Sequence, residues 1–263
     1  MARVCSLFSG SKGNSTYISC GSTGILVDCG VSNKRIADRL ADYNITPEAV
    51  SAVLITHEHT DHIQGLPVFL KHHPVPVYAT AGTLRGMIAA IPQLTELDLR
   101  PVDEHPFCVG DAEVSAFSTP HDANESCGYR IQTSDGRKIA VCTDLGHISL
   151  PIENALNGCD LVVLESNHDL DMLKNGIYPA HLKQRVMGMY GHLSNKACAD
   201  FLPKLLRGGT TRIILGHISQ ENNSIPLALH TATQSLQNAG YRVGNDCVLV
   251  AATPCGVGKM FVL

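Results

Sequence analysis

The segment THEHTDH, residues 56–62, constrains the fold of this chain more than any other feature of its sequence. It overlaps the end of AVLIT, a short apolar and β-branched run that predicts a buried strand. In extended backbone the residues i and i+2 point to the same side, so His57 and His59 can bind one ion. Asp61 and His62 come where the chain should turn into a helix, and they can serve a second ion. Histidine and carboxylate are common ligands of zinc-like ions, so we predict a metal site here rather than an ordinary surface turn.

Three further residues of ligand type follow apolar strands elsewhere in the chain. His121 comes after AEVSAFSTP, Asp144 after KIAVCT and His217 after TRIILG. Each of them alone is more often a turn or cap residue. Because all three follow strand ends, they can reach the same end of a sandwich of sheets. Together with residues 56–62 they predict a set of seven ligands.

Strand-like runs alternate with helical patterns in both halves of the chain. We expect strands at 3–8, 15–19, 24–27, 52–56, 76–79, 113–118, 127–133, 138–143, 161–165, 212–215, 247–252 and 259–263. We expect helices at 34–42, 64–72, 82–90, 195–206 and 227–239. This order predicts two sheets with helices outside, an αββα four-layer sandwich of the α/β class. We expect a single domain over residues 1–263, which is long enough for one large core.

The composition favours a cytoplasmic protein. The ten cysteines include no CxxC pair, which favours reduced thiols over a disulfide framework. The N-terminus lacks a long apolar run, and no apolar stretch reaches the ~20 residues of a spanning helix, so we expect no signal peptide and no membrane span. The formal charge of -4 neither requires nor excludes a nucleic-acid partner. The sequence does not distinguish a monomer from a dimer.

The order HxHxDH, then His, then Asp, then His resembles the metal pattern of the metallo-β-lactamase superfamily. The resemblance covers essentially the whole chain and implies two divalent ions, which can share a hydroxide when ~3.5–4 Å apart. It implies that the first ion is bound by His57, His59 and His121, the second by Asp61, His62 and His217, and both by Asp144. Asp28, in ILVDCG, matches a structural aspartate that supports the site.

The residues around the ligands narrow the expected chemistry. Asp144 stands where zinc β-lactamases often carry cysteine, and an all nitrogen and oxygen site suits phosphoester or thioester hydrolysis. We expect zinc, with manganese or iron as alternatives. Glyoxalase-type thioesterases resemble this site but use a C-terminal helical domain, and only 46 residues follow His217. The gap from Asp144 to His217 is also too short for the inserted domain of β-CASP nucleases.

The blocks VVLESNHD, GHLSNKACADFL and IILGHIS resemble the tRNase Z-type phosphodiesterases. That resemblance implies that Glu165 orients a catalytic histidine, His192, and that the metal ligand Asp61 also belongs to the catalytic set. A histidine can give a proton to the leaving alkoxide of a phosphodiester near neutral pH. His192 could instead be a residue at a helix start without a catalytic task.

The segments SGSKGNS, ILVDCG, LITHEHTDHIQG, ESNHD, YPAHLKQRV, GHLSN and HISQENN together resemble the bacterial YycJ/WalJ family. The resemblance implies a metal-dependent exonuclease that acts 5′ to 3′ on DNA and is implicated in mismatch repair. DNA is thus favoured as the substrate, and RNA stays open as an alternative. Two alternatives remain open: a small-molecule phosphodiesterase or thioesterase of the same fold, and a metal-binding protein without enzymatic activity.

Residues 172–214 carry seven basic residues and one acidic residue, a charge of +6 near His192. This asymmetry suits a polyanion, although a solvated helix face would look the same. The absence of tryptophan argues against a strong platform for base stacking. Candidate substrate contacts are Ser11, Asn14, His168, His181, Lys183 and Asn222.

Overall fold

The computed structural model describes residues 1–254, 256 and 258–263. The chain divides into two compact units. Unit 1 comprises Met1–Ala116, Ala123–Arg137 and Thr253–Leu263, and unit 2 comprises Phe117–Asp122 and Lys138–Ala252. Each unit has a hydrophobic core of its own.

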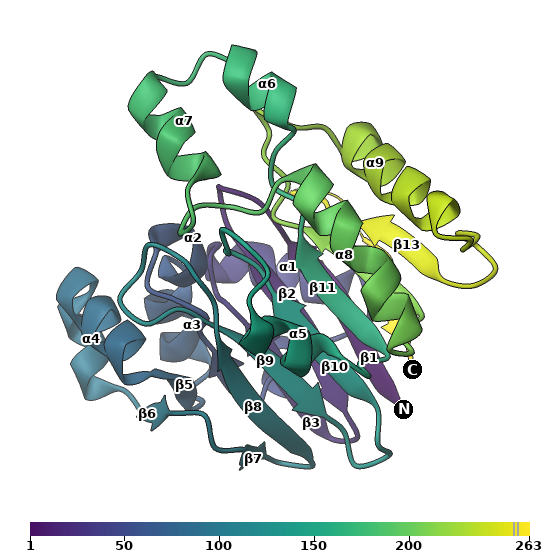
Figure 1. Cartoon of the computed structure of the whole chain (residues 1–263). Helices are drawn as coiled ribbons and strands as arrows, with labels where there is room; N and C mark the ends of the chain where they lie inside the picture. Colours follow the sequence, from purple (N-terminus) through teal and green to yellow (C-terminus); the bar gives the residue numbers. More distant parts are fainter. Residues whose placement is uncertain (255, 257) are drawn as a thin grey trace. The chain divides into compact units, whose positions relative to one another are not determined.

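Unit 1 contains a seven-stranded sheet in the order β14-β1-β2-β3-β4-β5-β6. Figure 1 labels several of its strands, among them β1, β2 and β3. Its strands are β1 (Ala2–Phe8), β2 (Ser15–Cys20), β3 (Thr23–Val27), β4 (Ala52–Leu54), β5 (Val77–Thr80), β6 (Leu99–Val102) and β14 (Phe261–Val262). The first three strands pair antiparallel, whereas β3 to β6 pair parallel. The parallel strands β3, β4 and β5 are buried along their whole length, which explains their continuous apolar sequences. The carboxyl ends of β3 and β4 lie at the same edge, where Asp28 and THEHTDH begin.

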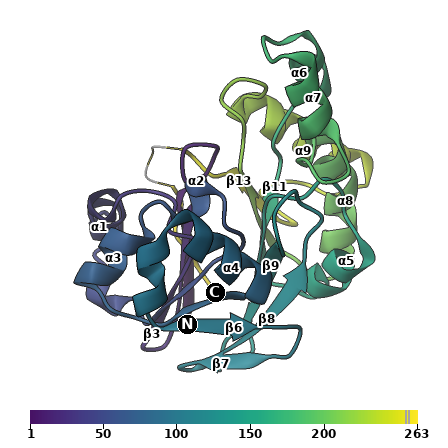
Figure 2. The same ribbon diagram turned by 90° about the vertical axis from the view of Figure 1, so that its left-hand side faces the viewer.

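Apolar faces of helices cover this sheet. The helical elements are α1 (Asn33–Ala41), η1 (Pro47–Ala49), α2 (Thr60–Ile63), α3 (Leu66–His72), α4 (Ala81–Ala90) and η2 (Pro92–Glu96). Ile36 and Leu40, four residues apart on α1, are buried with Phe69 of α3 in the core of unit 1. Helices α1 and α3 contact each other and lie side by side in Figure 2. Unit 1 also holds β7 (Phe107–Val109), the part of β8 (Ala112–Ser118) up to residue 116, which pairs antiparallel with β7, and β9 (Cys127–Gln132).

Unit 2 contains four parallel strands in the order β13-β12-β11-β10. These are β10 (Lys138–Cys142), β11 (Leu161–Glu165), β12 (Arg212–Gly216) and β13 (Val248–Ala251). The helices are α5 (Leu150–Leu156), α6 (Leu170–Asn175), α7 (Ala180–Met187), α8 (Asn195–Arg207) and α9 (Ile225–Asn238). Helices α8 and α9 pack side by side, whereas α6 and α7 extend away from the strands of their unit (Figures 1 and 2). Because the strands are parallel, Asp144, Glu165 and His217 all lie at one edge of this part of the sheet.

Most predicted elements are present, with three kinds of difference. The helix expected at 64–72 is divided into α2 and α3, since Gln64 and Gly65 interrupt it. Strands β6 and β7 were not predicted, and neither were α5, α6 and α7, which are too short to show a clear helical period. Within the described part of the chain, no helix is long and apolar enough to cross a membrane.

Candidate metal centre

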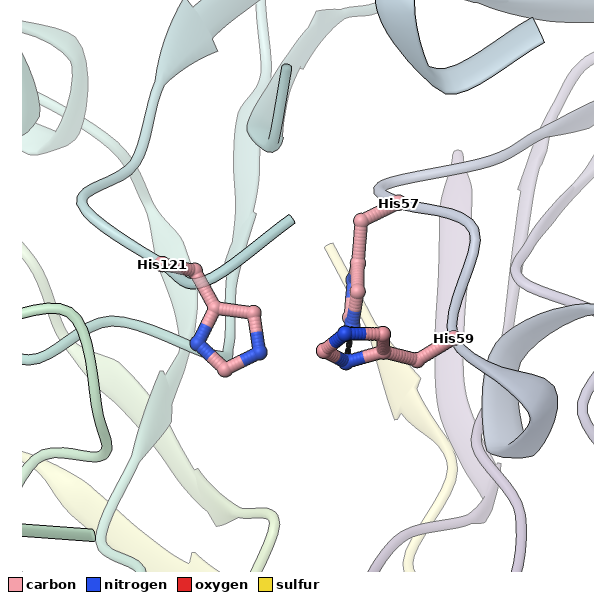
Figure 3. Close-up of side chains that lie close together, drawn as sticks. All are labelled: His57, His59 and His121. Carbon is pink, nitrogen blue, oxygen red and sulfur yellow. Dashed lines mark hydrogen bonds between the residues drawn. The ribbon is translucent and has the colours of Figure 1, made fainter. Parts of the chain in front are cut away.

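Unit 1 gathers four of the predicted ligands directly after β4. His57 and His59 turn their rings toward each other, with Nε2 of His57 3.1 Å from Nδ1 of His59 (Figure 3). His121, also drawn in Figure 3, belongs to unit 2. The rings of His57 and His62 lie 4.0 Å apart between centroids, and Nε2 of His62 is 3.6 Å from Oδ2 of Asp61. The four side chains therefore form one cluster of nitrogen and oxygen donors.

Asp28 holds the orientation of His62 from the end of β3. Its Oδ2 accepts a hydrogen bond from Nδ1 of His62 at 2.8 Å, and its Oδ1 accepts from the backbone N of Thr56 at 2.9 Å. A carboxylate only accepts, so Nδ1 of His62 carries the proton and Nε2 keeps its lone pair. A carboxylate behind a ligating histidine is the usual support of a metal site. The position of Asp28 fits the structural role that the resemblance implies.

Asn14, from SGSKGNS, is buried against the same cluster. Its Nδ2 lies 3.0 Å from Nε2 of His62 and 3.3 Å from Oδ2 of Asp61, and its Oδ1 accepts from the N of Gly10 at 2.9 Å. Its backbone N also donates to the carbonyl of Asp61 at 2.8 Å. Asn14 thus supports two predicted ligands, and Ser11, three residues before it, is exposed. Substrate contact by either residue stays a prediction.

Unit 2 supplies the other three predicted ligands, and two of them have unusual backbone. Asp144 has φ 60° and His217 φ 51°, and Asp28 in unit 1 shares this left-handed conformation at φ 65°. Residues other than glycine adopt it rarely, and it clusters at functional sites. Each of these residues stands just after a buried parallel strand, where the backbone turns sharply and the side chain is aimed by the turn.

The ring orientations in unit 2 fit metal ligation. His217 donates from Nδ1 to Oε1 of Glu165 at 2.8 Å, and His121 donates from Nδ1 to the carbonyl of Gly191 at 3.0 Å. Both acceptors lack a proton to give, so each histidine keeps the lone pair on Nε2. Burial, the largest influence, lowers the pKa of His121, which favours the neutral ring that a cation needs. Donors of this chemistry, so oriented, fit a divalent ion.

Glu165 lies at the end of β11 and is completely buried. Its Oε1 accepts from Nδ1 of His192 and from Nδ1 of His217, both at 2.8 Å. Its Oε2 accepts from the backbone N of Leu145 at 2.9 Å and of Leu193 at 3.1 Å. Burial raises the pKa of Glu165, but the two histidines outweigh it and hold the pKa below its ordinary value. The sequence predicted its contact with His192 and missed its contact with His217.

Asp144, Glu165, His192 and His217 offer ligand atoms within 4.8 Å of one another. Glu165 already accepts four hydrogen bonds, two of them from backbone groups whose positions are fixed. We therefore assign Glu165 to the support of the histidines and not to the ligand set. A proton-donating role for His192 stays a prediction, and its side chain is about one-fifth exposed.

The remaining candidates for substrate contact differ in exposure. His168 and Asn222 are buried, and burial lowers the pKa of His168 to about 4. His181 is exposed, and Nζ of Lys183 donates to the carbonyl of Lys174 at 2.8 Å. His168 and Asn222 therefore lie in the interior, whereas His181 is open to solvent.

The basic segment is less unbalanced in the structure than in the sequence. Arg185 bonds with Asp122, Lys204 with Glu153 and Lys196 with Asp200. The first two carboxylates lie outside residues 172–214, so a count along that segment does not include them. Charge alone is therefore weaker support for a polyanion than the sequence suggested.

A buried amide network that the sequence did not predict lies behind His217. Asn223 donates from Nδ2 to the carbonyls of Ser166 and Asn167, at 2.9 and 3.0 Å. Asn167 in turn donates to the carbonyl of His217 at 2.9 Å. The side chains of Asn195 and Asn223 also bond with each other. In the sequence, the only indication of this network was the pair Asn222 and Asn223 after LGHIS.

The comparisons with known proteins identify the family of this chain. A family model described as Beta-lactamase superfamily domain matches residues 23–218, which include all seven predicted ligands. Exodeoxyribonuclease WalJ of Streptococcus pneumoniae is 35% identical over 254 residues, 94% of this chain and 93% of that protein. Exodeoxyribonuclease YycJ of Bacillus anthracis is 36% identical over 241 residues, 90% of each. The chain belongs to the YycJ/WalJ family of the metallo-β-lactamase superfamily.

The fold agrees with this family. The metallo-β-lactamase fold protein YhfI from Bacillus subtilis superposes with a TM-score of 0.70 over 100% of both chains, at 16% identity. At that identity the likeness concerns the fold alone. The predicted αββα sandwich, with two mixed sheets flanked by helices, and the predicted family are both confirmed.

Proposed function

We propose that this chain is a metal-dependent nuclease, and more narrowly an exonuclease that degrades DNA from the 5′ end. The observation that carries the proposal is its similarity, along nearly the whole length, to proteins named exodeoxyribonuclease. The oriented donor set supports hydrolysis assisted by metal. A role in mismatch repair and a preference for DNA over RNA stay predictions from the resemblance.

The seven predicted ligands come from both units. In the proposed assignment His57, His59 and His121 hold one divalent ion, Asp61, His62 and His217 hold a second, and Asp144 serves both. Nitrogen and carboxylate donors suit zinc first, with manganese or iron as alternatives. When bound, the two ions would activate water and stabilise the negative charge of the phosphoryl group.

In the proposed mechanism, His192 would give a proton to the leaving group, and Glu165 would hold His192 in place. His192 has its Nδ1 hydrogen bonded to Glu165, so its Nε2 is the nitrogen available to give a proton. Glu165, with a pKa below its ordinary value, stays ionised and stabilises the positive ring of His192 before the transfer. General acid catalysis of this kind contributes on the order of 10²–10⁴ in rate.

The test is a substrate panel with the metal-loaded protein. We expect mononucleotides from 5′-labelled DNA, weaker cleavage of RNA and slow turnover of a chromogenic diester, with Asp61→Ala inactive as the control. Absence of cleavage of every nucleic acid would overturn the nuclease proposal. Turnover of the diester alone would instead support the alternative of a small-molecule phosphodiesterase.

We also propose a cytoplasmic location. Among the described residues no disulfide is formed, and all of the described cysteines except Cys108 are buried. Burial raises the pKa of Cys5 and of Cys127 to about 12, so these thiols stay protonated and unreactive near neutral pH. Cell fractionation with an antibody against the chain would test the location.

A further inference from the structure

The loop between α7 and His192 carries an exposed aromatic ring. This 188–191 loop runs from Gly188 to Gly191, and within it Met189 and Tyr190 are 62% and 64% exposed. All Phe and Tyr residues of the chain are described, and Tyr190 alone among them is exposed. The ring thus differs from every other Phe and Tyr ring of the chain, each of which is buried or half-buried.

The backbone of this loop is held by two neighbouring loops. The carbonyl of Tyr190 accepts a hydrogen bond from the N of Asp122 at 3.0 Å. The carbonyl of Met189 accepts from Nδ1 of His147 at 3.1 Å. Within the loop, the N of Gly191 bonds to the carbonyl of Gly188 at 2.9 Å. The exposure of Tyr190 therefore does not result from a loose loop.

The same loops carry predicted catalytic and ligand residues. Gly191 accepts the hydrogen bond of His121, and Gly146 packs so closely that a Cβ there would lie 2.2 Å from the carbonyl of Met189. Gly146 follows Asp144 by two residues. His192 is two residues beyond Tyr190, so their Cα atoms lie within about 7 Å. The aromatic ring is thus mounted on a braced backbone next to the proposed proton donor.

We propose that Tyr190 stacks on the base of the nucleotide beside the scissile phosphodiester. This inference rests on the proposed nuclease function and names how that site recognises its substrate. An aromatic ring can stack on any base, so the contact is tolerant of sequence. It requires an accessible base face, which a single strand or a frayed duplex end provides. Tyr190 supplies the stacking surface that the absence of tryptophan had argued against.

The surroundings of the ring favour a nucleotide over an apolar partner. Arg185, on the last turn of α7, is more than half exposed at its side chain although it bonds with Asp122. Because Asp122 bonds both with Arg185 and with the carbonyl of Tyr190, a guanidinium lies near the 188–191 loop, which suits the alternation of base and phosphate in a nucleic-acid strand. A protein partner docked on Met189 and Tyr190 is the competing possibility, and substitutions at Tyr190 distinguish it from base stacking.

Fluorescence can report the stacking directly because the chain has no tryptophan. Tyr190→Trp introduces a single one, and phosphorothioate linkages keep the oligonucleotide intact in the presence of metal. We expect strong quenching on binding a thymidine oligonucleotide and little quenching with an oligonucleotide that is abasic at its two 5′-terminal positions. Equal emission with and without a bound oligonucleotide, with binding confirmed by anisotropy of a labelled strand, would overturn the proposal.

Kinetics supply a second test with matched variants. Stacking of one base is worth about 1–3 kcal/mol, so Tyr190→Ala should raise KM for DNA about 5- to 150-fold. Tyr190→Phe should restore the KM of the original chain. Ile177→Ala, at a position 86% exposed outside the loop, is the control and should change nothing. For DNA that lacks a base at the cleavage site, Tyr190→Ala should leave KM unchanged, because there is no base for the ring to stack on.

The two proposals can fail separately. If Tyr190→Ala cleaves base-containing DNA with unchanged KM, the stacking proposal is wrong and the nuclease remains. If the original chain cleaves no nucleic acid, the nuclease proposal is wrong, and the fluorescence of Tyr190→Trp still decides whether the ring meets a base. If Tyr190→Ala leaves nucleic-acid binding intact but abolishes binding of another protein, the loop is a protein-docking surface and stacking is overturned.

Discussion

Glu165 accepts hydrogen bonds from two histidines that have different proposed tasks. One, His217, is a predicted metal ligand, and the other, His192, is the proposed proton donor. A single buried carboxylate therefore aligns both, while its second oxygen ties it to the backbone of Leu145 and Leu193. Substitutions at Glu165 and at His192 should differ in their effect on metal.

His192→Ala should keep metal affinity and lower kcat on the order of 10²- to 10⁴-fold, because only the proton donor is lost. Glu165→Gln should lower both the metal affinity and kcat. The amide nitrogen replaces one oxygen, so two buried donors lose their acceptor, at about 1–3 kcal/mol each. Misorientation of His217 should weaken metal binding by about 10- to 100-fold. Metal titration calorimetry beside kcat measures the contrast, and metal loss in His192→Ala would contradict it.

The burial of His168 should make the stability of the fold depend on pH. His168 is 1% exposed, and neither ring nitrogen has a hydrogen-bond partner among the described residues. Burial lowers its pKa from 6.5 to about 4. Between those values the unfolded chain binds a proton that the folded chain does not. The free energy of unfolding therefore falls as pH drops from 6.5 toward 4, by about 1.4 kcal/mol per pH unit.

His168→Leu should remove this part of the pH dependence, since a leucine has no proton to bind. Urea unfolding of the metal-free protein at pH 7 and pH 4.5 gives the change in the free energy of unfolding between the two pH values. The contribution of His168 is the difference in this change between the original chain and the variant. His72→Leu, at an exposed position, is the matched control. An unchanged pH dependence in His168→Leu would show that other groups cause it.

At the scale of elements, three loops of unit 1 interlock at the carboxyl ends of β3 and β4. The N of Gly30 donates to the carbonyl of Asn14, and the N of Asn14 donates to the carbonyl of Asp61, both at 2.8 Å. The N of Cys29 donates to the carbonyl of His62 at 2.8 Å. The turn that carries two predicted ligands is thus positioned by backbone bonds from two other segments.

Gly30→Ala should displace this turn. An added Cβ would lie 1.7 Å from the carbonyl oxygen of Asp61, so the backbone must move. We expect a loss of about 1–3 kcal/mol in the free energy of unfolding, as for an overpacked interior, together with weaker metal binding. Gly258→Ala is the matched control, since its Cβ would meet its nearest neighbour at an ordinary 3.4 Å. Urea unfolding and metal titration check both variants, and equal metal affinity would contradict the prediction.

At the scale of the whole molecule, each unit has its own core, but the predicted ligands are divided between the units. Four come from unit 1 and three from unit 2, and the family match at residues 23–218 extends through both. A ligand that binds only the folded chain raises the free energy of unfolding, by an amount that grows with the ratio of ligand concentration to Kd. Metal should therefore stabilise the native chain as a whole.

Chelation should lower the melting temperature. At a metal concentration of 100 times Kd, the added stability is about 2.7 kcal/mol. For a chain of this size, each kcal/mol shifts Tm by about 2–4 °C. Thermal unfolding with and without chelator measures the shift, and Asp61→Ala should show a smaller one. An unchanged Tm in protein that metal analysis shows to be loaded would contradict this expectation.

Much of the fold could be predicted, and candidate ligands could be proposed, because both depend on local patterns. The strands of the sheets are short apolar runs, and the ligand-type residues follow them directly, as with His57 after β4 and His217 after β12. The short helices α6 and α7 could not be predicted, because fewer than three turns give little periodicity. Their contacts with the rest of unit 2 depend on which segments fold beside them.

The sequence by itself determined the family, the αββα sandwich and the residues offered as ligands, because metal chemistry demands certain side chains at strand ends. Only the tertiary structure decided that Glu165 holds His217, a residue 52 positions away, as well as His192. It also decided that His168 is buried whereas Tyr190 is exposed on a braced loop. The physical reason is that exposure and hydrogen-bond partners depend on what packs over a side chain, and distant segments supply that packing.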